Sequence, residues 1–445
     1  MQSQSQFESI AAHALKTSRG EQTEVVLMGT DAALTRFSNN EIHQNVAERD
    51  VTLMVRLVLG KRVGVANTND ISKKGIEQVM EQAYRITSVL PENPEFPGLP
   101  VPKPVPQAGG FSIETAECGP EQRAAAVDRI CRRAEDVGLV SAGAFSTNTM
   151  SLLVANSLGV HAFHQRTFAN LLAVAMSDSS SGYADRTASN VRDIDAEAVV
   201  EEAVRRAELG KRPVAVEPGE YEVLLEPYAV SDLLDFLSYL GFSALAVQES
   251  RSFMGGKFGQ RLVGANVSIW DDGLDPAGIP MPFGFDGMPK RRVDFFKDGI
   301  AKEVCHDTIT AAKDKVETTG HALPPGMTYG PLPVNLFMGG GAATHEQMIA
   351  SMKRGLIVTR FWYTRVVHPL TATMTGMTRD GTFLVENGKV VGPVKNLRFT
   401  QSYLEALNHV DLVGKQSHIN RSWFSFNRVP ALKIGKWNFT GATEF

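Results

Sequence analysis

The chain has 445 residues, of which 43% are hydrophobic and 21% charged, and its formal net charge at pH 7 is -4. This composition is typical of a globular protein with about two to four ordinary domains. The negative balance argues against a broad electrostatic attraction to nucleic acid or acidic membranes, and no run approaches the roughly eighteen apolar residues of a membrane-spanning helix.

The first part of the chain is predicted to contain a helix, several short strands and a second helix. Apolar residues three and four apart predict a helix over 7–18. Short strands are predicted at 23–29, 33–40, 41–47, 51–60 and 62–67. Asp70 is the expected N-cap of the next helix. The N-terminal segment lacks the basic start and apolar stretch of a signal peptide, so a cytoplasmic location is expected.

A proline-rich segment, "LPENPEFPGLPVPKPVPQAGG", follows at 90–110. Its prolines favour extended geometry and exclude a helix, which indicates a stiff connector; a ligand for a proline-recognition domain is the alternative. The segment after it repeats the earlier order of helix, antiparallel strands and helix. These elements are predicted from about residue 119, at 138–176 and at 195–209.

Strands dominate the remainder of the chain. Two-residue hairpin turns between β-formers are predicted at Asp298-Gly299 and Asn387-Gly388. The predicted class is therefore α+β: an N-terminal α/β region with antiparallel sheets and flanking helices, followed by a β-rich C-terminal domain. The expected parts are an N-terminal subdomain, a linker, a central subdomain and the C-terminal domain, at 1–89, 90–110, 111–217 and 218–445.

Cysteines and paired acids do not form a recognisable site. Cys118, Cys131 and Cys305 are scattered and odd in number, which favours a reducing compartment and gives neither a disulfide framework nor a cysteine zinc site. Asp271 and Asp272 precede a glycine, so we interpret them as turn residues rather than as metal-binding carboxylates.

The stretch "THEQMIASMK" at 344–353 begins like half of a zinc-protease motif, with His345 followed by Glu346. A zinc helix needs a second histidine about one turn further on, and none follows here. The pattern instead predicts a helix start, in which Thr344 is the N-cap and Gln347 its capping-box partner.

Arginines and aromatic residues are concentrated in "KRGLIVTRFWYTRVVHP", "GMTRDGTFLVENG" and "VKNLRFTQS". Arginine forks are suited to a carboxylate or a peptide. The candidate cavity or substrate contacts are Arg360, Tyr363, Arg365, Arg379, Asn396 and Arg398. A solvated, partly packed sheet face is the alternative interpretation of the same residues.

These runs resemble the TldD/PmbA family, once called modulators of DNA gyrase. Two further matching stretches are "RFSNNEIHQNVAERDVTLMVRLVLGKRVGVANTN" and "LLDFLSYLGFSALAVQESRSFMGGKFGQ". The resemblance implies a cytoplasmic two-subunit zinc metallopeptidase with an enclosed cavity, in which a TldD subunit pairs with a PmbA (TldE) subunit. It also implies cleavage of small or unfolded polypeptides and trimming of peptide-antibiotic precursors.

The resemblance further implies a His-Glu-x-x-x-His zinc helix in TldD subunits and a C-terminal cysteine as third ligand. In this chain the counterpart of the helix is "DFLSYL", with Asp235, Phe236 and Leu240 where histidine, glutamate and histidine belong. No histidine occurs between His164 and His306. The chain therefore resembles the PmbA/TldE subunit: no catalytic or metal-ligating residue and no bound cofactor are expected in it, and zinc is expected in the partner.

Three functions follow from these observations. In the first, this chain is the partner of a TldD-type subunit and acts on peptides only within that complex. It contacts neither nucleic acid nor membrane, and it forms a homodimer when isolated. The second is a stand-alone metallopeptidase with an unrecognised metal site built from His306, His321 or His345. The third is a regulatory protein that binds gyrase or another regulator.

Overall fold

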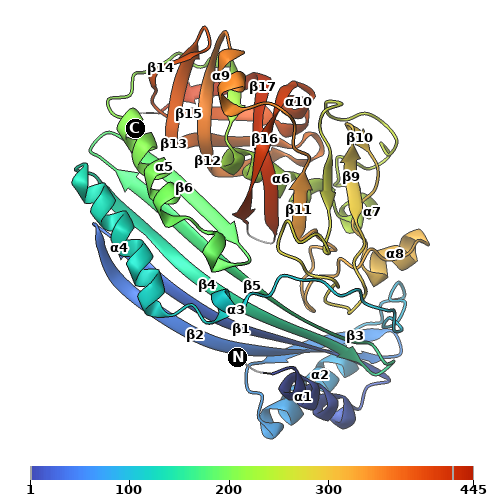
Figure 1. Cartoon of the computed structure of the whole chain (residues 1–445). Coiled ribbons are helices and arrows are strands. Elements are labelled where there is room, and N and C mark those ends of the chain that lie inside the picture. The colour runs from blue at the N-terminus through green and yellow to red at the C-terminus, as the bar shows by residue number, and fades with distance from the viewer. Residues whose placement is uncertain (1–2, 423–424, 444–445) are drawn as a thin grey trace.

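The structure is a computed structural model that describes residues 3–422 and 425–443 (Figure 1). It contains two large sheets with helices on their faces, which confirms the predicted α+β class. The predicted domain boundaries, whose ranges include the undescribed residues 1–2, 423–424 and 444–445, stay a prediction. Among the described residues, no helix has the length and apolar character needed to span a membrane.

The N-terminal half forms one antiparallel sheet of six strands in the order β3-β2-β1-β4-β5-β6. The strands are β1 Gln22–Ser38, β2 Glu41–Leu59, β3 Arg62–Thr68, β4 Val140–Asn156, β5 His161–Met176 and β6 Ser181–Ala188. The helices of this half are α1 Gln4–Thr17, α2 Lys73–Val89, α3 Ile113–Ala116, α4 Pro120–Asp136, α5 Ala196–Leu209 and the 3-10 turn η1 Val191–Asp193.

Residue alternation along β1 gives this sheet two different faces. Val25 and Leu27 pack in a core with α1 and α2. Val26, between them, packs on the other face with Met281 and Phe283 of the C-terminal half. The sheet therefore lies between its own helices and the C-terminal half, which Figure 1 shows at the upper right.

Strands β1 and β2 are long and continuous, so the prediction of separate short strands over this region is wrong. The predicted strands at 23–29 and 33–40 leave out Thr30 and Asp31. However, β1 pairs with β2 on one side and with β4 on the other along nearly its whole length. Ladder hydrogen bonds on both sides hold these polar residues in the strand, because pairing partners outweigh intrinsic propensity.

The C-terminal half contains a sheet of eleven strands, in which β17 pairs with β7 as well as with β15. Its strands are β7 Gly219–Leu225, β8 Ile269–Asp271, β9 Val293–Lys297, β10 Ile300–Ala301, β11 Asn335–Met338, β12 Arg354–His368, β13 Thr373–Glu386, β14 Lys389–Pro393, β15 Leu397–Ser402, β16 Val410–Arg421 and β17 Phe426–Ala442. Its helices are α6 Pro227–Gly241, α7 Ala244–Gln248, α8 Thr308–Asp314, α9 His345–Ala350, α10 Tyr403–Asn408 and the 3-10 turn η2 Pro369–Thr371. The additional pairing closes β7, β12, β13, β15 and β17 into a ring.

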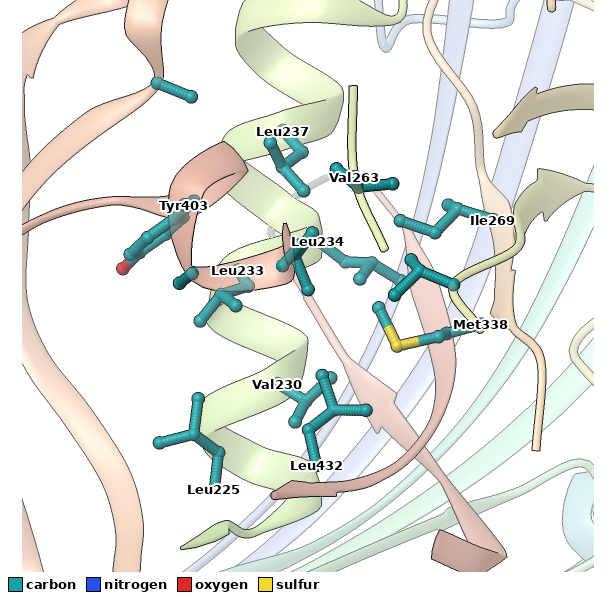
Figure 2. Packing of buried hydrophobic residues seen from close by; sticks show 14 of the residues in the cluster. Leu225, Val230, Leu233, Leu234, Leu237, Val263, Ile269, Met338, Tyr403 and Leu432 are labelled. Atoms are coloured by element: carbon teal, nitrogen blue, oxygen red, sulfur yellow. The ribbon is translucent and has the colours of Figure 1, made fainter. Parts of the chain in front are cut away.

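Helix α6 supplies much of the core of this half. Figure 2 shows Leu233, Leu234 and Leu237 of α6 among buried residues that include Met338 and Leu432. The three leucines are fully buried, and each contributes roughly 2 kcal/mol to stability through burial. Residues on the buried faces of α6 are thus committed to packing.

Local signals in the sequence explain several element ends. Both predicted hairpin turns are confirmed, and their residues have the left-handed φ values that such turns need: 51° and 79° at Asp298-Gly299, 49° and 75° at Asn387-Gly388.

The two predicted helix caps had different outcomes. The capping box of α9 is confirmed, since the Thr344 hydroxyl accepts a hydrogen bond from the Gln347 amide at 3.2 Å and the Gln347 side chain accepts one from the Thr344 amide at 2.9 Å. The prediction that Asp70 caps α2 is wrong. Ser72 is the N-cap, and Asp70 instead accepts a hydrogen bond from the Ser72 amide at 3.0 Å.

The proline-rich segment runs along the surface without helix or strand from 91 to 112. It is anchored at several points. The Leu99 amide donates to the Gln22 side chain at 2.7 Å, and the Asn156 side chain donates to the Pro100 carbonyl at 2.8 Å. Phe96 is buried in a small cluster with Leu99.

Candidate functional site

Three neighbouring strands bring the arginine-rich runs together. β12 carries Arg360 and Arg365, β13 carries Arg379, and β15 carries Arg398. In the antiparallel register Arg360 lies opposite Arg379, while Met377 of β13 lies opposite Arg398 on its other side. Residues far apart in sequence therefore share one surface.

A β-bulge in β12 exposes two consecutive aromatic residues. Tyr363 has φ of 53°, and the register with β13 shifts between Trp362 and Arg365. As a result both Trp362 and Tyr363 face solvent, at 39% and 67% exposure. Thr364 then returns inward, where its hydroxyl donates to Asp232 at 3.0 Å.

The surface contains a groove of about 440 Å³, which we call the arginine groove. It is lined by Trp362, Tyr363, Arg365, Thr375, Gly376, Met377, Arg379 and Arg398. A second cavity of about 570 Å³ adjoins it at Arg379 and is lined among others by Ser179, Ser180, Ser181, Arg212, Lys395 and Asn396. Five of the six candidate contacts thus line these two cavities, and their role as substrate contacts stays a prediction.

The sixth candidate, Arg360, supports the groove from behind. Its Nε donates to Asp380 Oδ2 at 2.6 Å, and its guanidinium lies 4.5 Å from the Tyr183 ring and 4.8 Å from the Trp362 ring. Ser181 of β6 donates to the other oxygen of Asp380 at 2.6 Å. Arg360 therefore holds Trp362 and joins the two sheets.

Sequence reasoning missed the groups that hold Arg360. Asp380 precedes a glycine and resembles a turn residue, and Tyr183 lies on a strand of the other half of the chain. The one available signal was the placement of Asp380 beside the candidate Arg379.

The counterpart of the zinc helix is part of α6, and its residues do not fit zinc. Phe236 packs edge-on against Tyr403 at 6.5 Å between ring centroids, and Leu240 is in the core. Asp235 accepts a hydrogen bond from the Asn427 side chain at 2.5 Å. Neither a phenyl ring nor an isobutyl group can bind a metal.

Two carboxyl groups on this helix have unusual acidity. Desolvation raises the pKa of Asp232 to about 6 and that of Asp235 to about 7, although hydrogen bonds from neighbouring groups oppose the rise. Asp232 accepts a hydrogen bond from the Tyr403 hydroxyl at 2.8 Å. These carboxyls are thus engaged within the fold.

The three histidines of the stand-alone hypothesis pair with three different carboxylates. The Nε2 atoms of His306, His321 and His345 lie 3.1, 2.8 and 2.9 Å from oxygens of Asp314, Asp271 and Glu226, respectively. They do not form a shared site. Over residues 3–422 and 425–443, no group of three or more histidine, cysteine, aspartate or glutamate side chains is placed to hold a metal.

The interpretation of Asp271 as a turn residue is wrong, whereas Asp272 does accept a turn hydrogen bond from the Leu274 amide at 3.0 Å. Asp271 is fully buried, and its Oδ2 accepts from the Val334 and Asn335 amides at 2.9 and 2.7 Å. Desolvation lowers the pKa of its neighbour His321, which favours the neutral imidazole. The alternation of apolar residues before Asp271 was the signal that could have identified this buried position.

Three family descriptions match the chain. They are "PmbA/TldA metallopeptidase domain 1" over residues 23–87, the central domain of the same family over 117–210 and its C-terminal domain over 218–441.

Individual relatives agree with these matches. An uncharacterised protein of Methanocaldococcus jannaschii is 29% identical over 187 residues, which are 41% of this chain and 44% of that protein. A metalloprotease TldD homologue of Haemophilus influenzae is 26% identical over 231 residues, which are 51% of this chain and 48% of that protein. The matched region thus spans about half the length of these relatives.

Solved structures share the fold over almost the whole chain. TldE from Thermococcus kodakarensis superposes with a TM-score of 0.89 at 19% identity, covering 98% of this chain and all of that one. A putative modulator of DNA gyrase from Thermotoga maritima gives a TM-score of 0.86 at 19% identity with the same coverage. At this identity the likeness concerns the fold alone.

Proposed function

Because this chain belongs to the PmbA/TldD metallopeptidase family, we propose that it is the TldE-type subunit of a two-chain peptidase, in which a TldD-type subunit supplies the zinc. In this proposal the complex acts in the cytoplasm on small or unfolded polypeptides, including peptide-antibiotic precursors. The chain on its own is not expected to hydrolyse peptides.

The observation that carries the proposal is the composition of α6. A zinc site would need two imidazoles and a carboxylate base projecting from one face of a helix. At the corresponding positions this chain has Asp235, Phe236 and Leu240, and the latter two pack against other apolar groups. Phe236 and Leu240 therefore serve in packing, and Asp235 accepts a hydrogen bond from Asn427.

The contribution of this chain would then be to bind and orient the polypeptide. The arginine groove presents charged and aromatic side chains on a sheet, and the adjoining cavity is lined in part by Ser179 and Ser180. Such a surface can hold an extended peptide while the partner cleaves it.

Co-expression with the TldD-type protein of the same organism tests the proposal. We expect the two chains to co-purify and the complex to cleave an unfolded polypeptide, whereas this chain with added zinc remains inactive. The TldD-type chain alone is the matched control. Chelator-sensitive cleavage by this chain alone would contradict the proposal, and recovery of gyrase in place of a TldD-type protein would favour the regulatory alternative.

A further inference from the structure

We infer that the arginine groove binds a carboxylate of a peptide, either the C-terminal carboxylate or an acidic side chain. This inference rests on the proposed function in taking a peptide as the ligand. It adds the chemical group that the groove recognises.

The charge of the groove supports an anionic ligand. Three of its lining residues, Arg365, Arg379 and Arg398, are arginines, and none is acidic. Asp380 Oδ1 lies 3.8 Å from Arg379 Nε, but Asp380 already accepts hydrogen bonds from Arg360 and Ser181. Planar guanidinium groups bind carboxylates through paired hydrogen bonds, so several of them facing one groove favour such a ligand.

Two of the three arginines contact aromatic rings of the groove. The Arg379 guanidinium lies 5.0 Å from the Trp362 ring, and that of Arg365 lies 5.6 Å from the Tyr363 ring. The bulge at Tyr363 turns both rings toward the groove side of the sheet. Side chains that are already ordered lose less conformational freedom on binding, which increases affinity.

The dimensions favour a peptide over a nucleic acid. The groove and the adjoining cavity enclose about 440 and 570 Å³ and meet at Arg379, which lines both. If the carboxylate of a peptide bound in the groove, the adjacent residues of that peptide would contact Trp362, Met377 and the serine-lined cavity. Proteins that bind single-stranded nucleic acid use a basic groove that follows the backbone over about 4–16 nucleotides. The arginine groove is too short for such a site, and the net charge of the chain is -4.

Titration calorimetry on the purified full chain tests the inference with four probes. The first is an N-acetylated peptide of about eight residues with uncharged side chains and a free C-terminal carboxylate, and the second is its C-terminal amide, which carries no charge. The third is the amide with one internal aspartate, and the fourth is a single-stranded oligonucleotide. We expect one or both carboxylate-bearing peptides to bind at least about tenfold more tightly than the neutral amide. The first and third probes distinguish the two sources of the carboxylate.

Variants connect the binding to the groove. Arg379→Ala should weaken binding of the carboxylate-bearing peptide about tenfold. The affinity of Arg379→Lys should lie between those of Arg379→Ala and the unmodified chain, because lysine keeps the charge but lacks the paired donors of the guanidinium group. The matched control is Arg132→Ala on α4, whose side chain is 74% exposed and pairs with Asp128; it should bind normally.

Several results would overturn the inference: equal binding of the neutral amide, no binding of any peptide, no effect of Arg379→Ala, or tighter binding of the oligonucleotide. The measurement needs neither zinc nor a partner chain. A negative result would therefore leave the subunit assignment intact, and a failure of the co-expression test would leave the binding result intact.

Discussion

Some of the buried charges lie where the two halves of the molecule meet. Glu24 on β1 is fully buried, and its Oε1 is 3.1 Å from Arg56 Nη1. Burial raises the pKa of Glu24 to about 7, the nearby Arg56 opposes this rise, and Asp286 of the C-terminal half adds to it. The ionised form is therefore costly in the folded state.

Glu24→Gln should change how stability depends on pH. The folded pKa lies above the ordinary value of 4.5, so the unfolded chain releases this proton first and the original protein loses stability as the pH rises toward 7. The variant lacks this loss. Its free energy of unfolding, relative to that of the unmodified protein, should therefore be about 2–3 kcal/mol higher near pH 8 than near pH 5. Urea unfolding at both pH values measures it. A stability difference that does not vary with pH would contradict the expectation.

Arg360→Ala should destabilise the protein by about 3 kcal/mol, because it leaves Asp380, which is only 4% exposed, without its main counter-charge. Arg354→Ala, on the same strand, is the control. Its side chain is 61% exposed and lies 3.5 Å from Glu386, so the change should cost less than about 1 kcal/mol. Chemical unfolding of both variants checks the contrast, and equal losses would argue against a supporting role for Arg360.

The partners of buried residues are not evident from the local sequence. Asp271 precedes Asp272 and Gly273, so its local context indicates a turn. Its actual partner, His321, is fifty positions away in sequence. Pairings of this kind depend on the topology of the chain, which local residue patterns do not contain.

The bulge in β12 determines which side chains line the arginine groove. A non-glycine residue at φ of 53° is disfavoured by its side chain, most strongly when that side chain is branched at Cβ. Here the conformation turns Trp362 and Tyr363 to the same side.

Substitutions at Tyr363 test this strain. Tyr363→Val should cost about 1–2 kcal/mol, whereas Tyr363→Asn should change stability by less than about 0.5 kcal/mol, because asparagine tolerates the left-handed region. The exposed Lys389 on β14, whose φ is not positive, serves as control, and Lys389→Val should have little effect. Thermal unfolding measures all three. Equal melting temperatures for Tyr363→Val and Tyr363→Asn would show that the backbone at residue 363 is not strained.

The elements differ in how well the sequence predicts them. The capping box of α9 and the hairpins at Asp298 and Asn387 were predictable, because each depends on residues within four positions of one another. The lengths of β1 and β2 were not, because pairing on both sides of β1 keeps Thr30 and Asp31 in the ladder. The arginines were identified as candidates, but the register that brings three strands' arginines to one groove was visible only in the fold.

The absence of histidine and cysteine from α6 leads to an expectation about the melting temperature of the isolated chain. A metal bound by the folded chain alone would add stability by mass action, and its removal would lower the melting temperature. We expect EDTA to leave the melting temperature of the isolated chain unchanged within error, and elemental analysis to find far less than one zinc per chain. A fall of several degrees with EDTA would point to a metal site in this chain.

The general architecture was predictable from the sequence, but the ring of strands in the C-terminal half was not. The α+β class follows from alternating patterns and turn signals along the chain. The ring of strands in the C-terminal half depends on β17 pairing with β7 across about two hundred residues of sequence, and no local pattern indicates that pairing.

The continuity of the N-terminal sheet has a consequence for a molecule cut by a protease. β1 and β4 lie on opposite sides of the proline-rich segment in sequence, yet they pair from Glu24–Asn156 to Ser38–Ala142. A nick within residues 91–109 would therefore yield two fragments that stay interlocked and elute together in gel filtration under native conditions. Only a denaturing gel would reveal the cut, and either fragment made separately would display an open β-edge prone to aggregation.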